Sequence, residues 1–119
     1  MTITIIPDKY IPDKVAINKV ILLGNAGSDP RMYYPEKDSA MALFSLATNE
    51  RIGSSERTEW HNIVMTGKNA EYAEKYIRKG TKLYIEGKIR TRSYTDKLHI
   101  QRNITEIYVD IFEILGRGN

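Results

Sequence analysis

The sequence predicts an all-β domain in which five strands form a Greek-key barrel, with one short helix between the third and fourth strands. Three observations support this prediction. Several segments alternate apolar and polar residues, which is typical of half-buried strands. The one segment with helical spacing follows the third strand, and two long strand segments come after it. A lone helix at this position is typical of the five-stranded OB barrel and argues against a β-sandwich.

The chain begins with a predicted arm and a first strand. Residues 1–16 contain two prolines and a repeated Pro-Asp-Lys, which predict an extended arm outside any central sheet. The first strand, 17–23, is nearly continuous in aliphatic residues. It ends at Gly24 and Gly27, where glycine permits either a positive φ or a close approach of two backbones. Residues 33–38 are expected to form a loop.

Two further strands and the helix follow. The second and third strands are predicted over 41–48 and 59–67, and the polar stretch 49–57 between them is expected to be mobile. Asn69 is a suitable N-cap for the helix, which has acidic residues early and basic residues late. Gly80 is suited to ending that helix.

The last two strands are predicted over 82–95 and 98–115. The short connection between them pairs them as a long hairpin. Residues 17–115 therefore form the predicted domain, and residues 116–119 form a short tail.

Composition excludes several kinds of site. The chain of 119 residues suffices for one domain, and its hydrophobic content of 41% is ordinary. With no cysteine and two histidines, we expect neither disulfides nor a metal site. The sequence contains no phosphate-binding lysine loop and no nucleophile elbow. It also lacks a membrane-spanning segment and a signal peptide. We therefore expect a cytoplasmic protein without a cofactor, not an enzyme.

Basic and aromatic residues are concentrated on one predicted strand. Arg90, Arg92 and Tyr94 fall on alternate positions, so they share a face, and Lys88 precedes them on that face. Because the whole chain has a net charge of only +3, this basic charge is local. Cations that contact phosphates and rings that stack on bases hold single-stranded nucleic acid without reading its sequence. A solvated hairpin is the alternative explanation of the charges.

Trp60 is a second candidate for base stacking. It shares a strand face with Asn62 and Thr66, whose polar side chains favour a groove over a core position. His61 points the other way, among aliphatic neighbours. This favours packing or a subunit contact for His61 over general-base chemistry.

Five segments resemble the family of bacterial-type single-stranded DNA-binding proteins, and they occur in the family's order. They are Ile17–Asn25, Asp29–Pro30, Thr58–His61, Tyr76–Gly80 and Tyr84–Arg92. The resemblance covers residues 17–115 and implies an OB-fold subunit of a homotetramer, or alternatively a dimer, around which single-stranded DNA wraps. It implies base stacking by Trp60 and Tyr94. It also implies a subunit interface that contains His61, where we expect Tyr84 as well.

Further DNA contacts are expected outside the main groove if the strand wraps the subunit. The candidates are Arg31, Lys68, Lys79 and the helix residue Tyr76, whereas the head of Lys19 is expected to reach solvent or a groove. Each cation is otherwise an ordinary surface charge, and Tyr76 is otherwise a packing partner of Tyr72, four residues earlier.

The sequence departs from the family pattern at three places. Thr66 and Ile52 stand where relatives often have aromatic residues. Two aromatic side chains on which bases could stack are therefore missing. We expect each subunit to bind single-stranded DNA more weakly than a subunit of an aromatic-rich relative. Residues 116–119 carry no acidic tip, which leaves open whether replication or repair proteins are recruited by that route.

These observations predict sequence-independent binding and protection of single-stranded DNA in replication, repair and recombination. The alternative is an OB-fold adaptor in replication restart, for which DNA binding is secondary. A nuclease of the same fold would need clustered acidic metal ligands, and the acidic residues of this chain are scattered along the sequence.

Overall fold

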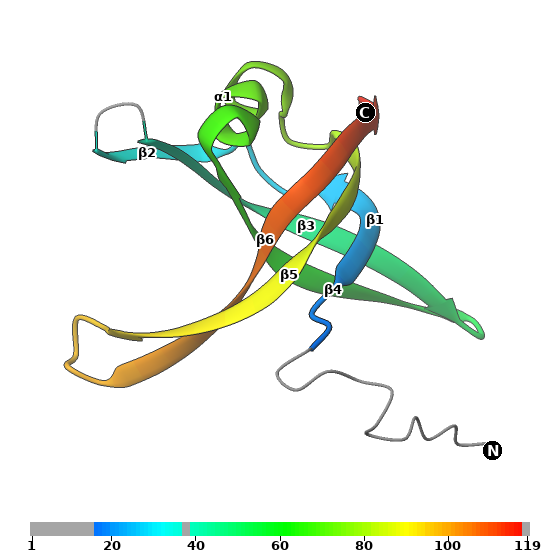
Figure 1. The fold of residues 1–119 in the computed structure, drawn as a ribbon. Helices are drawn as coiled ribbons and strands as arrows, with labels where there is room; N and C mark the ends of the chain where they lie inside the picture. The colour runs from blue at the N-terminus through cyan, green and yellow to red at the C-terminus, as the bar shows by residue number, and fades with distance from the viewer. Residues whose placement is uncertain (1–15, 37–38, 118–119) are drawn as a thin grey trace, which may run out of the picture.

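The computed structural model describes residues 16–36 and 39–117, so the predicted N-terminal arm lies outside the described residues except for Ala16. The elements are β1 (Val20–Ala26), β2 (Arg31–Glu36), β3 (Ser39–Ile52), β4 (Ser55–Thr66), α1 (Gly67–Tyr76), β5 (Lys82–Thr95) and β6 (Gln101–Gly116). The strands form one sheet in the order β1-β5-β6-β4-β3-β2, and β1 also pairs with β3 (Figure 1). This extra pairing closes five strands into a barrel, so the predicted fold class is confirmed.

Gly24 allows the barrel to close. Asn25 and Ala26 of β1 pair with Ala47 and Leu46 of β3. A Cβ on Gly24 would lie 2.2 Å from the carbonyl oxygen of Ala47, so any larger residue would push the two strands apart. Of the two reasons for glycine considered above, close approach is therefore the correct one here.

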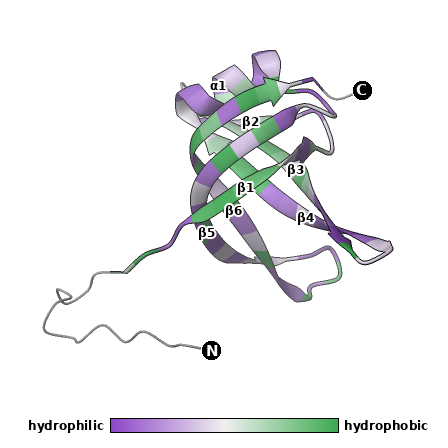
Figure 2. Cartoon of the chain, turned by 90° about the vertical axis from the view of Figure 1, so that its right-hand side faces the viewer, coloured by the Kyte–Doolittle hydropathy of each residue, from purple (hydrophilic) through white to green (hydrophobic). Residues whose placement is uncertain are grey.

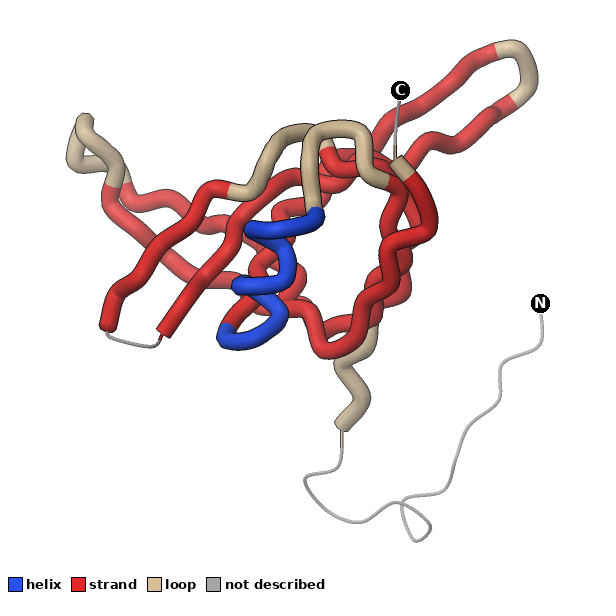
Figure 3. The backbone as a smooth tube through the Cα atoms, turned by 90° about the horizontal axis from the view of Figure 1, so that it is seen from above, coloured by secondary structure: helices blue, strands red, loops and turns tan. Residues whose placement is uncertain are grey.

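Alternating apolar side chains fill the barrel. Figure 2 shows hydrophobic and hydrophilic residues alternating along the strands. The buried cluster includes Ala42, Phe44 and Leu46 of β3, Ile63 and Met65 of β4, and Leu83 and Ile85 of β5. α1 lies at one end of the barrel (Figure 3), where it adds Ala70 and Ala73 to the same core.

The structure corrects the predicted loop over 33–38. Residues 31–36 form β2, with Arg31, Met32 and Tyr33 paired to β3. The register shifts between Tyr33 and Glu36, around Pro35, whose missing N–H an edge strand tolerates. Because of this additional strand, α1 lies between β4 and β5, not between the third and fourth strands as predicted.

The polar stretch 49–57, which was not predicted as strand, also pairs. It forms the paired ends of β3 and β4 around a turn at Gly53, whose φ is 62°. Thr58 Oγ1 donates a hydrogen bond of 2.7 Å to Asn49 Oδ1 across the two strands. The polar composition reflects exposure of both faces of this hairpin and does not prevent strand pairing.

The helix begins and ends earlier than predicted. Thr66, not Asn69, is the N-cap, and it makes no side-chain capping bond. The helix ends at Tyr76 because Ile77 is extended, with φ −91° and ψ 129°. Arg78 caps the end with Nη1, which donates 2.8 Å and 2.7 Å hydrogen bonds to the carbonyl oxygens of Glu74 and Ile77.

The last two strands form the predicted hairpin. β5 has the predicted bounds, but β6 begins at Gln101 because residues 96–100 form a turn. Asp96 Oδ1 accepts hydrogen bonds from the backbone N–H groups of Leu98 (2.9 Å) and Ile100 (3.0 Å). The β5–β6 and β3–β4 hairpins extend from opposite sides of the barrel (Figures 1 and 3).

Candidate nucleic-acid interface

A groove crosses the outer face of the sheet. It consists of two adjoining hollows of about 370 and 520 Å³. Both are lined by Arg31, Leu43 and Arg92, so the two hollows lie side by side. Polar side chains, among them Ser45, Asn62 and Glu106, complete the first hollow, and Tyr33, Tyr34, Pro35 and Met41 complete the second. We call the two hollows together the groove.

Trp60 lies on the same face as the groove. It is two positions from Asn62 in β4, so both side chains point to the same side of the sheet. The indole is 61% exposed, although tryptophan is usually a well-buried residue. One edge of the ring rests against Gly27, where an added Cβ would lie 2.4 Å from Cζ3. Trp60 therefore offers an exposed aromatic surface beside the groove.

Two arginine guanidinium groups lie over tyrosine rings on the β5–β6 hairpin beside the groove. The Arg90 guanidinium lies over the ring of Tyr108, 4.6 Å from its centroid. The Arg92 guanidinium lies 5.9 Å from the ring centroid of Tyr94, and Tyr94 is 43% exposed. These distances are in the range of cation–π attraction, which holds the cations and rings near one another.

A buried carboxylate holds Arg92. Arg92 Nε donates a 2.8 Å hydrogen bond to Glu106 Oε1, and Nη2 donates a longer one of 3.4 Å to Oε2. Glu106 is 2% exposed, and no other charged side chain among the described residues is buried. The hydrogen bond that Arg92 donates to Glu106 raises the pKa of Arg92 above its ordinary value. Glu106 therefore fixes one edge of the guanidinium at the floor of the groove.

Lys19 and Tyr84 form a separate cluster with Glu86. Tyr84 Oη donates a 2.5 Å hydrogen bond to Glu86 Oε2, and Lys19 Nζ lies 3.0 Å from Glu86 Oε1. These contacts lower the pKa of Glu86, and the hydrogen bond to Glu86 raises the pKa of Tyr84. Because of its ion pair with Glu86, Lys19 is already paired, and it does not line the groove. Lys88, a little further along β5, lies 3.8 Å from Asp110.

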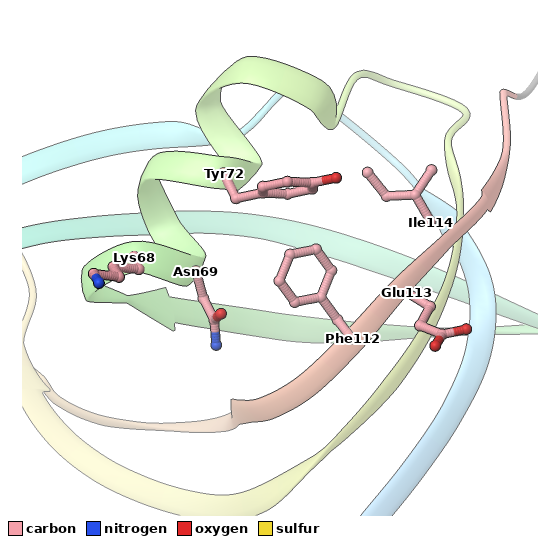
Figure 4. A pocket seen from close by; sticks show the side chains of 6 residues that line it. All are labelled: Lys68, Asn69, Tyr72, Phe112, Glu113 and Ile114. Carbon is pink, nitrogen blue, oxygen red and sulfur yellow. The ribbon is translucent and has the colours of Figure 1, made fainter.

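The predicted site residues in α1 and just after it lie at two other hollows. Lys68 lines a hollow of about 500 Å³ with Tyr72 and Phe112, whose rings pack edge to face at 5.6 Å (Figure 4). Tyr76 and Lys79 line another, of about 360 Å³, together with the basic residues Lys75, Arg78 and Arg117. The expected packing of Tyr72 against Tyr76 is confirmed by a centroid distance of 4.5 Å.

His61 is half-buried on the face of β4 opposite Trp60. Its Nε2 lies 2.9 Å from Thr48 Oγ1. Thr48 follows Ala47, the last residue of β3 that pairs with β1. His61 therefore lies where β1 and β3 separate.

Within residues 16–36 and 39–117, no group of three potential metal ligands occurs, and no helix is long and apolar enough to span a membrane.

Sequence reasoning missed three residues in or beside the groove. Tyr33 was assigned to a loop, although two adjacent tyrosines before a proline suggest an exposed edge strand. Tyr108 lies under Arg90, and alternation in β6 alone does not identify its partner. Glu106 was counted among scattered acidic residues, because its burial arises only when β4, β5 and β6 come together.

The sequence was compared with known protein families and structures. The model of the single-strand binding protein family matches residues 17–115. The chain belongs to this family. A single-stranded DNA-binding protein of Bacteroides thetaiotaomicron is 53% identical over 109 residues, which cover 86% of this chain and 68% of that relative. In the solved Plasmodium falciparum SSB complex with ssDNA, the SSB chain matches with a TM-score of 0.77 and 31% identity, over 87% of this chain and 99% of that chain.

Membership of the single-strand binding protein family indicates which ligand to consider for the groove. The structural relative was solved with single-stranded DNA, and the match extends over nearly its whole chain. Apart from Arg117, the aromatic and basic side chains described above lie within the residues matched by the family, so they are the candidates for contact with a strand.

Proposed function

We propose that this protein binds single-stranded DNA without strong sequence preference. By this binding it protects exposed strands in the cytoplasm during DNA replication, repair and recombination. The observation that carries the proposal is the exposed indole of Trp60 beside a groove lined by Arg31 and Arg92. A family member similar to this chain is named a single-stranded DNA-binding protein, and a structural relative was solved with single-stranded DNA.

The mechanism is binding by stacking and charge, not catalysis. Trp60 and Tyr94 stack on bases, and each stacked base contributes about 1–3 kcal/mol. Arg31 and Arg90 contact phosphates, and their contacts release counterions from the strand. Affinity should therefore fall steeply as the salt concentration rises.

The DNA path continues onto the helix end of the subunit. Tyr76 and Lys79 border a hollow whose other charged side chains, Lys75, Arg78 and Arg117, are all basic. Lys68 lies near the start of α1, and Lys88 is held only loosely by Asp110. These side chains contact phosphates outside the groove, so their loss should weaken binding less than loss of Trp60.

The subunit assembles into a homotetramer. Residues 20–24 of β1 pair with β5 on one side, but β1 pairs with β3 only at Asn25 and Ala26, which leaves an unpaired edge. Ile21 and Leu23 are 58% and 53% exposed on this strand. An exposed apolar strand edge is a natural place for another copy to add.

The strand registers support a second contact on the adjacent face. They place Ile21 and Ile111 on either side of Glu86, and Leu23 next to Tyr84. We therefore include Tyr84 in the subunit interface, together with His61, which lies where β1 and β3 separate. The cluster of Tyr84, Glu86 and Lys19 supplies polar groups to this otherwise apolar surface.

Sedimentation of the wild type and of Leu23→Glu tests the assembly. The substitution places a charge on the unpaired edge, so we expect a species of lower mass at equal concentration. Ile52→Glu, at the exposed tip of the β3–β4 hairpin, is the matched control and should leave the mass unchanged. A monomeric wild type contradicts the assembly but not DNA binding.

Trp60 fluorescence tests the proposed function directly. Trp60 is the only tryptophan of the chain, so its signal reports on this position alone. We expect strong quenching on titration with poly-dT at low salt, and weaker binding at high salt. Absence of quenching in the folded protein, together with absence of DNA binding in a mobility-shift assay, would favour the adaptor function.

A further inference from the structure

We infer that Glu106 positions Arg92 to contact the edges of bases, with a preference for guanine, and that Arg92 is not a phosphate contact. This inference rests on the proposed binding of single-stranded DNA. It revises the expectation that the cations of β5 act alike, and it adds a limited sequence preference to an otherwise non-selective interface.

The hydrogen bonds to Glu106 occupy one edge of the Arg92 guanidinium. Nε and Nη2 donate to the two carboxylate oxygens, at 2.8 and 3.4 Å. The edge formed by Nη1 and the second hydrogen of Nη2 has no such partner among the described residues. The Arg92 side chain is half exposed and lines both hollows of the groove, so this edge is accessible to a ligand there.

The ion pair also removes most of the net charge at this position. Glu106 lies at the groove floor with 2% exposure, so its charge is poorly screened by water. A phosphate approaching Arg92 meets a neighbouring carboxylate as well as the guanidinium. The salt bridges of the described residues include neither Arg31 nor Arg90, so no carboxylate occupies an edge of either guanidinium, and both edges stay available to phosphates.

A fixed, charge-compensated guanidinium is suited to the edge of a base. The remaining edge donates two parallel hydrogen bonds, and guanine O6 and N7 are two acceptors with matching geometry. Adenine offers N7 beside an amino donor, which opposes one of the two bonds. Glu106 is thus a positioning residue, because without it the long arginine side chain would sample many rotamers.

Three oligonucleotides of equal length test the base preference in lithium buffer, where guanine-rich strands remain unstructured. One alternates thymine with guanine, one thymine with adenine, and one thymine with 7-deazaguanine. For the wild-type protein we expect the guanine strand to bind about five-fold or more tightly than the other two, since a bidentate contact gives measurable discrimination. Equal affinity for the guanine and adenine strands would overturn the inference.

Charge-matched variants test the role of the ion pair. Arg92→Gln combined with Glu106→Gln keeps the net charge, so the salt dependence of poly-dT binding should stay unchanged while the guanine preference is lost. Arg90→Gln is the control that removes a phosphate contact. It should lower the slope of log K against log salt by about 0.7 and keep the preference.

Glu106→Gln alone gives an independent result if the double variant folds poorly. It leaves the Arg92 charge uncompensated, so the salt slope should rise by about 0.7 while the guanine preference falls. A double variant whose slope falls as far as that of Arg90→Gln would show that Arg92 contacts phosphate, and would overturn the inference. Failure to bind any oligonucleotide would instead refute the proposed function.

Discussion

Gly27 lies against the indole of Trp60, and the contact leaves no room for a side chain. A Cβ at this position would lie 2.4 Å from Cζ3 of the ring and 2.7 Å from Ser45 Oγ. The backbone N–H of Gly27 also donates a 2.8 Å hydrogen bond to the carbonyl oxygen of Ser45, which fixes the loop in place. The orientation of the principal stacking residue therefore depends on a glycine more than thirty positions earlier in the chain.

We expect Gly27→Ala to weaken binding of single-stranded DNA. The added methyl group must displace the indole, and one misplaced stacking platform costs about 1–3 kcal/mol. Titration with poly-dT should show lower affinity and a different extent of quenching of Trp60. Gly116→Ala is the control, because a Cβ there meets no atom within 4 Å. Wild-type affinity in Gly27→Ala would show that the indole position does not matter.

Tyr33 is expected to be a further base platform. It is 48% exposed and lines the groove with Arg31 and Arg92. Tyr33→Ala should weaken binding of oligo-dT by about 1–3 kcal/mol, as measured by fluorescence anisotropy of the labelled oligonucleotide. Tyr34→Phe is the control, since it removes only the 2.8 Å hydrogen bond to Glu74 and keeps the ring. If both variants bind equally well, bases do not enter this part of the groove.

Restoring an aromatic residue at position 66 should tighten binding. Thr66 is exposed, lies on the groove face in register with Met41, and makes no side-chain capping bond to α1. Thr66→Phe therefore loses no helix cap and gains a stacking surface. We expect a gain of about 1 kcal/mol in a salt titration with poly-dT. Thr66→Val separates the effect of the ring from that of added apolar area, and equal gains in both variants would exclude stacking.

The tip of the β5–β6 hairpin should lose order in acid. The hydrogen bond from Arg102 and those from the backbone N–H groups of Ile100 and Leu98 lower the pKa of Asp96 below its ordinary value of 3.8. A lowered pKa in the folded state means that the stabilisation is complete above the ordinary value and is lost as the pH falls through the lowered one.

Amide chemical shifts of Leu98 and Ile100 measure this titration. We expect both to move together with a midpoint below pH 3.8. Asp96→Asn keeps an acceptor oxygen for the two amides but cannot titrate, so its amide shifts should stay constant over the same range. A midpoint at or above the ordinary aspartate value would contradict the prediction.

The sequence was most informative where one face of a strand is apolar. Alternation through residues 82–95 predicted β5 with its observed bounds. Alternation through residues 59–67 correctly separated Trp60 from the side chains of the core. β2 and the polar hairpin around Gly53 were missed, because strands that are exposed on both faces lack this pattern. Their pairing comes from neighbouring strands, which a local pattern does not reveal.

The groove illustrates the same limit. Arg92 was recognised as a candidate because basic residues cluster around it, and Trp60 because its neighbours on the strand face are polar. Arg31 was expected only as a contact outside the main groove, whereas it lines both hollows. Glu106 was not, because a glutamate in an alternating strand is ordinary until its burial is known. The difference between a free arginine and one held by a carboxylate depends on contacts between strands that are far apart in the sequence.

The parallel pairing of β4 with β6 has a consequence for how the protein folds. β3–β4 and β5–β6 are local hairpins, a class of structure that forms within about 1–10 μs in isolation. The register that joins them, residues 62–64 with 106–108, spans more than forty positions and must await closure of a long loop. Asn62 of β4 and Glu106 of β6 both line the groove. They come together only when these two strands pair. A folding chain can thus hold nearly all of its strands and still have no surface on which to receive DNA.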